Sequence, residues 1–472
     1  MLDHLLDLDA TSVYEQIIKG KVSSVEVVQV YINHLKTKED KINAIVEDRF
    51  ELALQEAKEA DDYFEHHQKP IGPLHGVPIC VKESFDVKGM KTTGGLIHLK
   101  NNIAKEDAFI VKRLKEAGAI ILCKTNTSTL CYAQESVNKL YGTTNNPWDI
   151  TRTAGGSSGG EGALLAIGGG AAGFGSDIGG SIRFPSHLNG VIGFKSGMFQ
   201  IDARGHFPPD VVPLQKRMSS SGPMGKSVRD MKRLYNIVAN KPAIEKKLND
   251  LVIEMLPSEQ PYPISLKTSK MLIDVQVFLS NQFTIIEEMP PYFDESAQLW
   301  QEIMSINGSD DIKQISFNNK RKNLVLTYLK EKFTKKTDWH EYLLWALIGS
   351  TLFKPSKKRI EEIKKTLQTG DQLLKDYFKN RILILPVYAT GALKHGEIFK
   401  QIFSIKKTFK QYMPYTAYSN VWGLPTLTLP ITLDEENMPI AVQIISTNGN
   451  EGKIFAVGKL LEEQFRGYKR KK

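Results

Sequence analysis

The sequence predicts an α/β fold built as one domain over residues 1–472, and three observations lead to this prediction. Short apolar runs of strand length alternate with segments of helical periodicity in the first third of the chain. Strand-like runs return near the end, after a long helical stretch, and we expect them to rejoin the early sheet. The content of 41% hydrophobic and 24% charged residues is that of an ordinary folded protein.

Residues 1–65 are predicted to form helices that pack on the outside of the core. Ser23 is followed three positions later by Glu26, which makes a capping box ahead of an apolar run that keeps helical spacing through Leu35. A second helical run covers residues 50–63.

The alternation of strand and helix begins after this helical region. We predict a strand over residues 77–81, a helix over residues 107–117 and a second strand over residues 119–123. Gly118 ends the helix, because glycine readily adopts the left-handed conformation that closes a helix.

Residues 225–380 are richer in lysine and glutamate and are predicted to be mostly helical insertions. Strand signals return at residues 382–388, 424–431 and 440–445. These three strands are the ones that we expect to complete the sheet.

The chain carries a formal charge of +9 from 62 basic and 53 acidic residues. A basic balance can indicate a nucleic acid or an anionic membrane as partner. No zinc-finger spacing, basic zipper or aromatic RNA-binding signature accompanies the basic runs, so we predict no nucleic-acid partner.

Three further features bear on the cellular location. Cys80, Cys123 and Cys131 lack CxxC spacing, which fits a reduced protein. The first residues are interrupted by acids and do not resemble a secretory signal. No uncharged apolar stretch reaches the roughly 18 to 20 residues of a membrane span. We therefore predict a cytoplasmic protein.

Residues 153–197 are dense in glycine and nearly free of charge, which is typical of backbone packed tightly around a site. This stretch holds Ser157 within GGSSGG and Ser181 within DIGGSIRFP. Glycines before a nucleophile allow successive N–H groups to turn toward one oxyanion. The predicted donors of this oxyanion hole are the N–H groups of Ile178, Gly179, Gly180 and Ser181.

A serine hydroxyl needs a base to become a nucleophile, and the two serine motifs contain no histidine apart from His187 at their margin. Lys82 stands at the end of the apolar strand instead. Burial disfavours the ammonium form and lowers the pKa of a lysine, which makes a neutral amine available as a base. Lys82 is therefore our candidate for the general base.

Residues 77–82 and the two serine motifs together resemble the amidase signature family. The resemblance implies that Ser181 is the nucleophile, that Ser157 is a bridging serine after a cis peptide bond, and that Lys82 is the general base. It implies hydrolysis of a carboxamide without metal or organic cofactor. The fold that it implies is an α/β/α sandwich around a mixed, mostly parallel sheet, in which the insertions of residues 225–380 form the substrate channel.

Within the family, residues 159–164 and 181–185 are most similar to fatty acid amide hydrolases, which implies a fatty acid amide or another N-acyl amine as substrate. The alternative enzyme is a general or amino-acid-type amidase, including the A subunit of the tRNA-dependent glutamine amidotransferase. That subunit usually has glutamine where Phe184 stands, which disfavours it. The alternative from another class is a non-enzymatic membrane-binding protein on an amidase scaffold, and the presence of all three triad residues disfavours that.

Three further residues of the serine motifs are predicted to support the site. Asp177 and Arg183 flank the nucleophile, and we expect a buried or half-buried ion pair that braces the loop. Ser158 is expected to hold its own loop by hydrogen bonding. His75 and Cys131 are predicted to be packing residues.

The glycine-rich stretch also allows two other interpretations. Residues 156–160 fit G-x-S-x-G, the nucleophile elbow of α/β hydrolases, with Ser158 as nucleophile. It would need a downstream acid and a histidine, and nothing recommends any of the candidates His206, His340 and His395. The G-x-G-x-x-G at residues 168–173 lacks the acidic residue that a dinucleotide site requires.

The segment Trp339–Phe353 carries two tryptophans and is flanked by lysines. Aromatic residues with flanking lysines suit a helix that lies in a membrane interface, so a peripheral membrane contact is one interpretation. A buried helix or a homodimer contact is the other. We hypothesise that this helix forms an apolar mouth through which an acyl chain enters.

Overall fold

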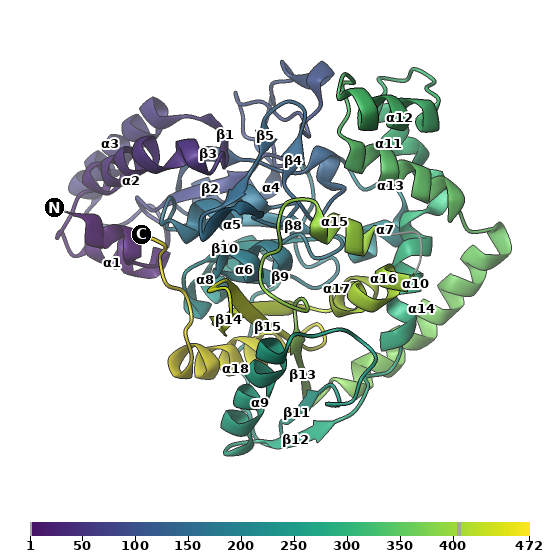
Figure 1. Cartoon of the computed structure of the whole chain (residues 1–472). Coiled ribbons are helices and arrows are strands. Elements are labelled where there is room, and N and C mark those ends of the chain that lie inside the picture. The colour runs from purple at the N-terminus through teal and green to yellow at the C-terminus, as the bar shows by residue number, and fades with distance from the viewer. Residues whose placement is uncertain (1, 404–406) are drawn as a thin grey trace.

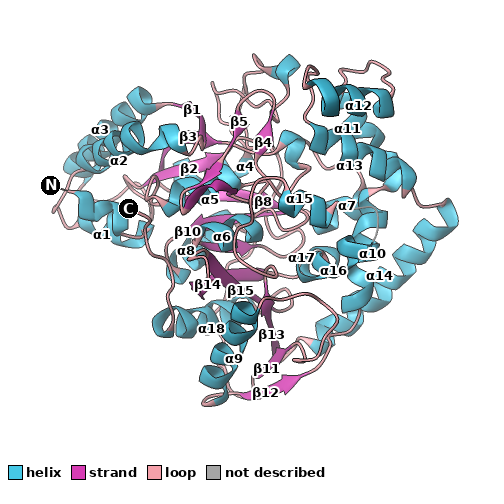
Figure 2. Ribbon diagram, in the orientation of Figure 1, coloured by secondary structure: helices cyan, strands magenta, loops and turns pink. Residues whose placement is uncertain are grey.

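A computed structural model describes residues 2–403 and 407–472, and its centre is one long sheet of eleven strands among these residues. Figures 1 and 2 show the sheet crossing the whole molecule with helices on either side. In order across the sheet, the strands are β1 (Ile45–Asp48), β3 (Ile120–Thr125), β2 (Pro78–Lys82), β8 (Ala172–Asp177), β10 (Ser220–Gly225), β9 (Ile192–Lys195), β14 (Thr426–Leu433), β15 (Pro439–Ile445), β13 (Arg381–Pro386), β11 (Val252–Met255) and β12 (Thr284–Glu287). Two small ribbons pair β4 (Val137–Asn138) with β5 (Gly142–Thr143) and β6 (Asn145–Asn146) with β7 (Asp149–Thr153).

The α/β class and the mixed sheet are confirmed, but parallel pairing is less common than we expected. Within the described residues, four neighbouring pairs are parallel, namely β2–β3, β2–β8, β11–β13 and β11–β12. The other six pairs are antiparallel. An apolar run predicts a strand but carries no information on its direction, and short connections such as the one between β14 and β15 force antiparallel neighbours.

The helices cover both faces of the sheet. They are α1 (Ala10–Ile18), α2 (Ser24–Lys38), α3 (Phe50–His67), α4 (Phe109–Glu116), α5 (Gly159–Ala166), α6 (Arg183–Asn189), α7 (Pro213–Met218), α8 (Val228–Val238), α9 (Leu266–Ser280), α10 (Phe293–Met304), α11 (Asp310–Ser316), α12 (Leu324–Thr334), α13 (Glu341–Leu352), α14 (Lys357–Tyr377), α15 (Glu397–Ile402), α16 (Lys407–Tyr412), α17 (Pro414–Val421) and α18 (Glu451–Gln464). Short 3-10 turns are η1 (Asp3–Asp7), η2 (Glu39–Lys41), η3 (Ile97–Leu99), η4 (Thr129–Cys131) and η5 (Ile306–Ser309).

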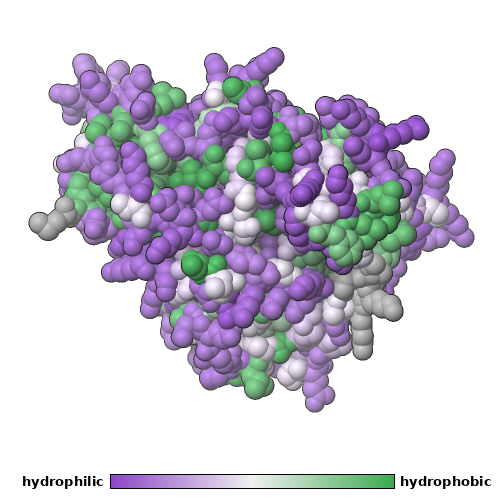
Figure 3. All heavy atoms as spheres, turned by 45° about the horizontal axis from the view of Figure 1, so that its top comes forward, coloured by the Kyte–Doolittle hydropathy of each residue, from purple (hydrophilic) through white to green (hydrophobic). Residues whose placement is uncertain are grey.

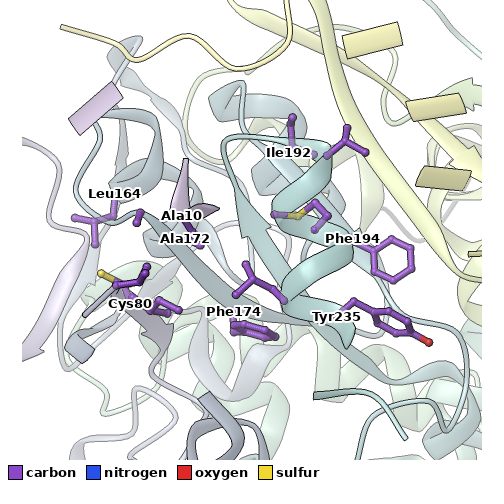
Figure 4. Close-up of a cluster of buried hydrophobic side chains, with 14 of the residues drawn as sticks. Ala10, Cys80, Leu164, Ala172, Phe174, Ile192, Phe194 and Tyr235 are labelled. Atoms are coloured by element: carbon purple, nitrogen blue, oxygen red, sulfur yellow. The ribbon is translucent and has the colours of Figure 1, made fainter. Parts of the chain in front are cut away.

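The core is divided in two by the sheet, and β13 shows this division in its sequence. Ile382 and Ile384 belong to the cluster that α8, α9 and α18 cover, whereas Leu383 and Leu385 belong to the cluster under α10 and α14. Side chains alternate between the faces of a strand, so both faces of β13 are buried. On the first face, Phe194 of β9 contacts Tyr235 of α8 edge to face, with ring centroids 5.2 Å apart (Figure 4).

The N-terminal region has the two helices that were predicted. The capping box of Ser23 and Glu26 is present at the start of α2, which runs to Lys38, and α3 follows from Phe50. The two chain ends come together on this side of the molecule (Figure 1), where Arg470 forms an ion pair with Asp7.

Residues 225–380 are mostly helical, as predicted, but they also contribute β11 and β12 at one edge of the sheet. These strands have only four residues each, and charged positions interrupt their apolar pattern, so neither stood out in the sequence. None of the helices in the described parts of the chain combines the length and apolar character that a membrane span requires.

Candidate active site

Lys82 is the last residue of β2, whose two neighbours β3 and β8 both run parallel to it. Its side chain is completely buried. Lys82 Nζ donates to Ser157 Oγ at 2.6 Å and to Ser176 Oγ at 2.9 Å. Burial lowers the pKa of Lys82, because the ammonium form loses its hydration. The sequence therefore delivers a lysine with a depressed pKa to a buried serine.

Ser157 lies in the glycine loop between β7 and α5, and the peptide bond from Gly156 to Ser157 is cis. A side chain on Gly156 would meet the backbone of Glu135 at 2.6 Å, so this position requires glycine. Ser136 holds the loop from the other side: its hydroxyl donates to the Ser157 carbonyl at 3.0 Å and accepts the N–H of Gly159 at 2.8 Å.

Ser181 lies in the turn between β8 and α6, and a buried ion pair braces this turn. Asp177 and Arg183 approach to 2.9 Å, and both side chains are fully buried. Burial alone would raise the pKa of Asp177, but the Arg183 guanidinium outweighs this effect and holds the pKa well below its usual value. Arg183 also donates to Ser419 and Gln443, which anchors the turn to the C-terminal part of the chain.

Ser158 connects the two serine loops. Its N–H donates to the Ser181 carbonyl at 3.2 Å, and its hydroxyl makes a long contact of 3.4 Å with the Ser176 carbonyl. The side chain of Ser158 is fully buried.

Of the four predicted oxyanion donors, the N–H of Gly180 has another acceptor. It donates to Asp177 Oδ1 at 2.8 Å, so Gly180 leaves the set. The N–H groups of Ile178, Gly179 and Ser181 have no acceptor among the described residues. The sequence could not show which N–H groups are free, because this depends on the orientation of the Asp177 carboxylate, which accepts the Gly180 N–H.

Two cavities meet at Ser181. The first has a cavity volume of about 90 Å³. Its wall is apolar and carries Trp300, Met304, Trp345, Ile348, Leu352, Phe353, Ile402, Phe403 and Phe409. The second has a cavity volume of about 40 Å³ and is more polar, with Ser157, Ser176, His206, Asp210, Ser219 and Asp311 in its wall. Cys131, Tyr132, Ile178, Ser181 and Met304 line both.

Three residues of the site were missed or misjudged in the sequence. Ser176 bridges Lys82 and His206, with His206 Nε2 at 2.9 Å from its hydroxyl. Cys131 was predicted to be a packing residue, yet it lines both cavities. Burial raises the pKa of its thiol, but Lys82 and His206 outweigh burial and lower the pKa to about 6. Only the position of Ser176 beside Asp177 offered a signal, since Cys131 and His206 lie outside every motif.

The segment Trp339–Phe353 belongs to the core and to the cavity wall. Leu343, Leu344 and Leu347 of α13 are buried. The indole of Trp345 donates to the Phe403 carbonyl at 2.7 Å and faces the apolar cavity. Leu352 at the end of α13 is 64% exposed, and further exposed apolar side chains belong to the preceding helix α12, where Phe333 is 78% exposed.

Comparison with known proteins finds relatives that match nearly the whole chain. Residues 26–455 match the family described as Amidase. The chain is 32% identical to the fatty-acid amide hydrolase 2-B of Danio rerio and 30% identical to the fatty-acid amide hydrolase 2 of Homo sapiens, in each case over 98% of this chain and 90% of the relative. The A subunit of the glutamyl-tRNA(Gln) amidotransferase of Thermoanaerobacter pseudethanolicus is 27% identical over 97% of this chain and 96% of that protein.

Solved structures show the same fold. A fatty acid amide hydrolase superposes with a TM-score of 0.79 at 23% identity, covering 98% of this chain and 85% of that chain. A 6-aminohexanoate cyclic dimer hydrolase superposes with a TM-score of 0.82 at 22% identity, covering 99% of each. With the sequence match over most of its length, the chain belongs to the amidase signature family of amide hydrolases.

Proposed function

We propose that the chain hydrolyses amides of long acyl chains through an acyl-enzyme on Ser181. The observation that supports this proposal is the hydrogen bond of 2.6 Å between the buried Lys82 and Ser157, because Ser157 lines the same cavity as Ser181. A neutral amine in this position can receive a proton through one hydroxyl, which is the task of a general base. The described residues hold no group of three or more His, Cys, Asp or Glu that would suit a metal ion.

We propose the following course for the reaction. Ser181 gives its proton to Ser157 as its oxygen attacks the amide carbon, and Ser157 passes a proton to neutral Lys82. The N–H groups of Ile178, Gly179 and Ser181 stabilise the oxyanion. The proton then returns by the same route to the amide nitrogen, the C–N bond breaks and the amine leaves. Water hydrolyses the ester on Ser181, and the acid is released.

The acyl part of the substrate is inferred from the apolar cavity. None of the Asp, Glu, Lys, Arg or His side chains of the described residues lines it, so a charged substrate group would lose most of its hydration there. This favours a long acyl chain over an amino acid amide. The relatives named as fatty-acid amide hydrolases support the same choice, whereas the relative from an amidotransferase leaves the general amidase as the alternative.

Peripheral contact with a membrane is the second part of the proposal. Val325, Leu326, Leu329 and Phe333 of α12 are exposed, and Lys330 and Lys332 are exposed beside them. Figure 3 shows an apolar patch bordered by hydrophilic residues on the side of the molecule where α12 and α13 lie. A helix of this composition suits an interface with anionic lipid. Residues of the neighbouring helix α13 line the apolar cavity. The three unpaired cysteines fit a reducing, cytoplasmic setting.

The substrate proposal is tested by hydrolysis of a matched amide series, from acetamide to long-chain N-acyl ethanolamines, by the wild-type protein and by Ser181→Ala. We expect activity that rises with chain length and is lost in Ser181→Ala. Activity confined to short or amino acid amides would retain the amidase chemistry and reject the lipid substrate. An inactive wild-type protein in all assays would favour the non-enzymatic alternative.

A further inference from the structure

Trp300 touches both parts of the site at once. It belongs to α10, is 7% exposed and lines the apolar cavity beside Ser181. Its indole Nε1 donates to the Ile178 carbonyl at 2.6 Å. The same ring lies against Gly179, where an added Cβ would come within 2.8 Å of the indole. The Trp300 side chain thus forms part of the wall of the apolar cavity and also binds the loop before Ser181.

The hydrogen bond from Trp300 to the Ile178 carbonyl determines the direction of the Gly179 N–H. The carbonyl of Ile178 and the N–H of Gly179 belong to one planar trans peptide and point in opposite directions. An acceptor fixed on one side therefore fixes the donor on the other. The N–H of Gly179 is one of the donors without an acceptor among the residues that the structure describes.

The following peptide is held in a related way. Gln134 Nε2 donates to the Gly179 carbonyl at 3.1 Å, and the N–H at the opposite end of that peptide, from Gly180, donates to Asp177. In the peptide that Gln134 holds, the Gly180 N–H is already bound to Asp177. In the peptide that Trp300 holds, the Gly179 N–H remains available to bind a substrate.

We propose that Trp300 is a positioning residue that couples the filling of the acyl cavity to the oxyanion hole. An acyl chain in the cavity packs against the indole and holds Nε1 on the Ile178 carbonyl, so that the Gly179 N–H meets the developing oxyanion. This inference rests on the proposed function. Under this proposal, the length of the acyl chain affects the rate of the reaction step, kcat, as well as the binding of the substrate.

Trp345 provides a matched control. It also lines the apolar cavity and also donates its indole N–H to a carbonyl at 2.7 Å, but the acceptor is Phe403 in the far wall and not the loop before Ser181. Replacement of either tryptophan by phenylalanine removes one indole donor and a similar amount of apolar wall. Only Trp300 is expected to affect the oxyanion.

The experiment compares Trp300→Phe with Trp345→Phe. With the best amide substrate, we expect Trp300→Phe to lower kcat by about 10- to 100-fold, somewhat less than loss of an oxyanion donor, and to raise KM by as much as Trp345→Phe does. Trp345→Phe should raise KM and leave kcat near the wild-type value. Equal kcat values for Trp300→Phe and the wild-type protein would overturn the inference.

A binding measurement tests the same point without turnover. A trifluoromethyl ketone with a long acyl chain forms an oxyanion on the nucleophile, whereas the alcohol of the same chain does not. Trp300→Phe should weaken binding of the ketone more than binding of the alcohol, by the factor seen in kcat. Equal weakening of both compounds would reduce Trp300 to a packing residue, and failure of the proposed substrate would instead appear as inactivity of the wild-type protein. Trp300→Met replaces Trp300→Phe if the latter does not fold.

Discussion

Lys82 is surrounded by groups that shift its pKa in opposite directions. Burial lowers the pKa, while the Cys131 thiol and the carboxylates of Asp177 and Glu83 raise it. The Cys131 thiol has a pKa of about 6, because Lys82 and His206 outweigh the effect of burial. The thiolate form of Cys131 and the ammonium form of Lys82 stabilise each other, and the ammonium form cannot act as a base.

Cys131→Ala should consequently extend activity to lower pH. Without the thiolate, the pKa of Lys82 falls further, so the neutral amine persists at a more acidic pH. We expect the acidic limb of the kcat/KM profile to move down by about one pH unit. Cys123→Ala is the control, because Cys123 is also buried but lines neither cavity. An unchanged acidic limb in Cys131→Ala would show that the thiol does not act on the base.

At this scale, the sequence predicted the residues that stand in glycine motifs and missed those that tertiary structure brings in. Ser157 and Ser181 were visible because glycines surround them, and Lys82 because it ends an apolar strand. Cys131 reaches the site through a left-handed backbone conformation with φ of 62°, which nothing in its neighbourhood signals. The roles of the three predicted residues stay predictions until they are tested.

At the scale of elements, the short segment of residues 134–136 ties three parts of the site together. Gln134 binds the oxyanion loop through the Gly179 carbonyl. Glu135 accepts the N–H groups of Gly396 and Phe399 at the start of α15, whose end lines the apolar cavity. Ser136 holds the loop of Ser157. The segment forms almost no regular structure, so periodicity gave no reason to single it out.

Helix α12 is the element on which the membrane proposal depends. Phe333→Glu places a charge in its exposed apolar surface and should reduce sedimentation with anionic vesicles by about 10-fold or more, while hydrolysis of a water-soluble amide stays unchanged. Leu266→Glu is the matched control, since Leu266 of α9 is 89% exposed at the opposite end of the molecule (Figure 1). Equal vesicle binding by Phe333→Glu and the wild-type protein would reject the membrane contact.

At the scale of the whole molecule, the sheet combines strands from both ends of the chain. The protein interior beside this sheet contains a buried carboxylic acid, Glu161. Glu161 of α5 is fully buried, and its Oε2 accepts a hydrogen bond from Thr125 of β3 at 2.8 Å. Its other oxygen has no partner among the described residues. Burial raises the pKa of Glu161 to about 8, so the folded protein holds this group in its neutral form near pH 7.

Stability should therefore fall as the pH rises. Between the ordinary pKa of 4.5 and the folded value of about 8, the unfolded chain ionises Glu161 while the folded chain does not. The free energy of unfolding of the wild-type protein, relative to Glu161→Gln, should fall by up to about 1.4 kcal/mol per pH unit across this range. Denaturant unfolding of both proteins at pH 5, 6.5 and 8 measures this difference. A difference that is constant with pH would mean that Glu161 is already ionised in the folded state.

The overall architecture was predictable to the extent that it depends on apolar runs and helix caps. The early strands, the late strands and the helices α2 and α3 lie where the sequence predicted them. The direction of the middle strands could not be predicted from the sequence, because β10 inserts between β8 and β9 and runs antiparallel to both. Pairing of this kind depends on contacts distant in sequence, which local patterns do not encode.

The nucleophile is tested most directly by labelling with a long-chain alkyl fluorophosphonate, followed by intact mass measurement and peptide mapping. We predict one adduct, on Ser181, in the wild-type protein and in Ser158→Ala. Labelling should slow by about 1,000-fold in Lys82→Ala and in Ser157→Ala, because the activated hydroxyl is lost. An adduct on Ser158, or wild-type labelling rates in Lys82→Ala, would contradict the proposed relay from Ser181 through Ser157 to Lys82.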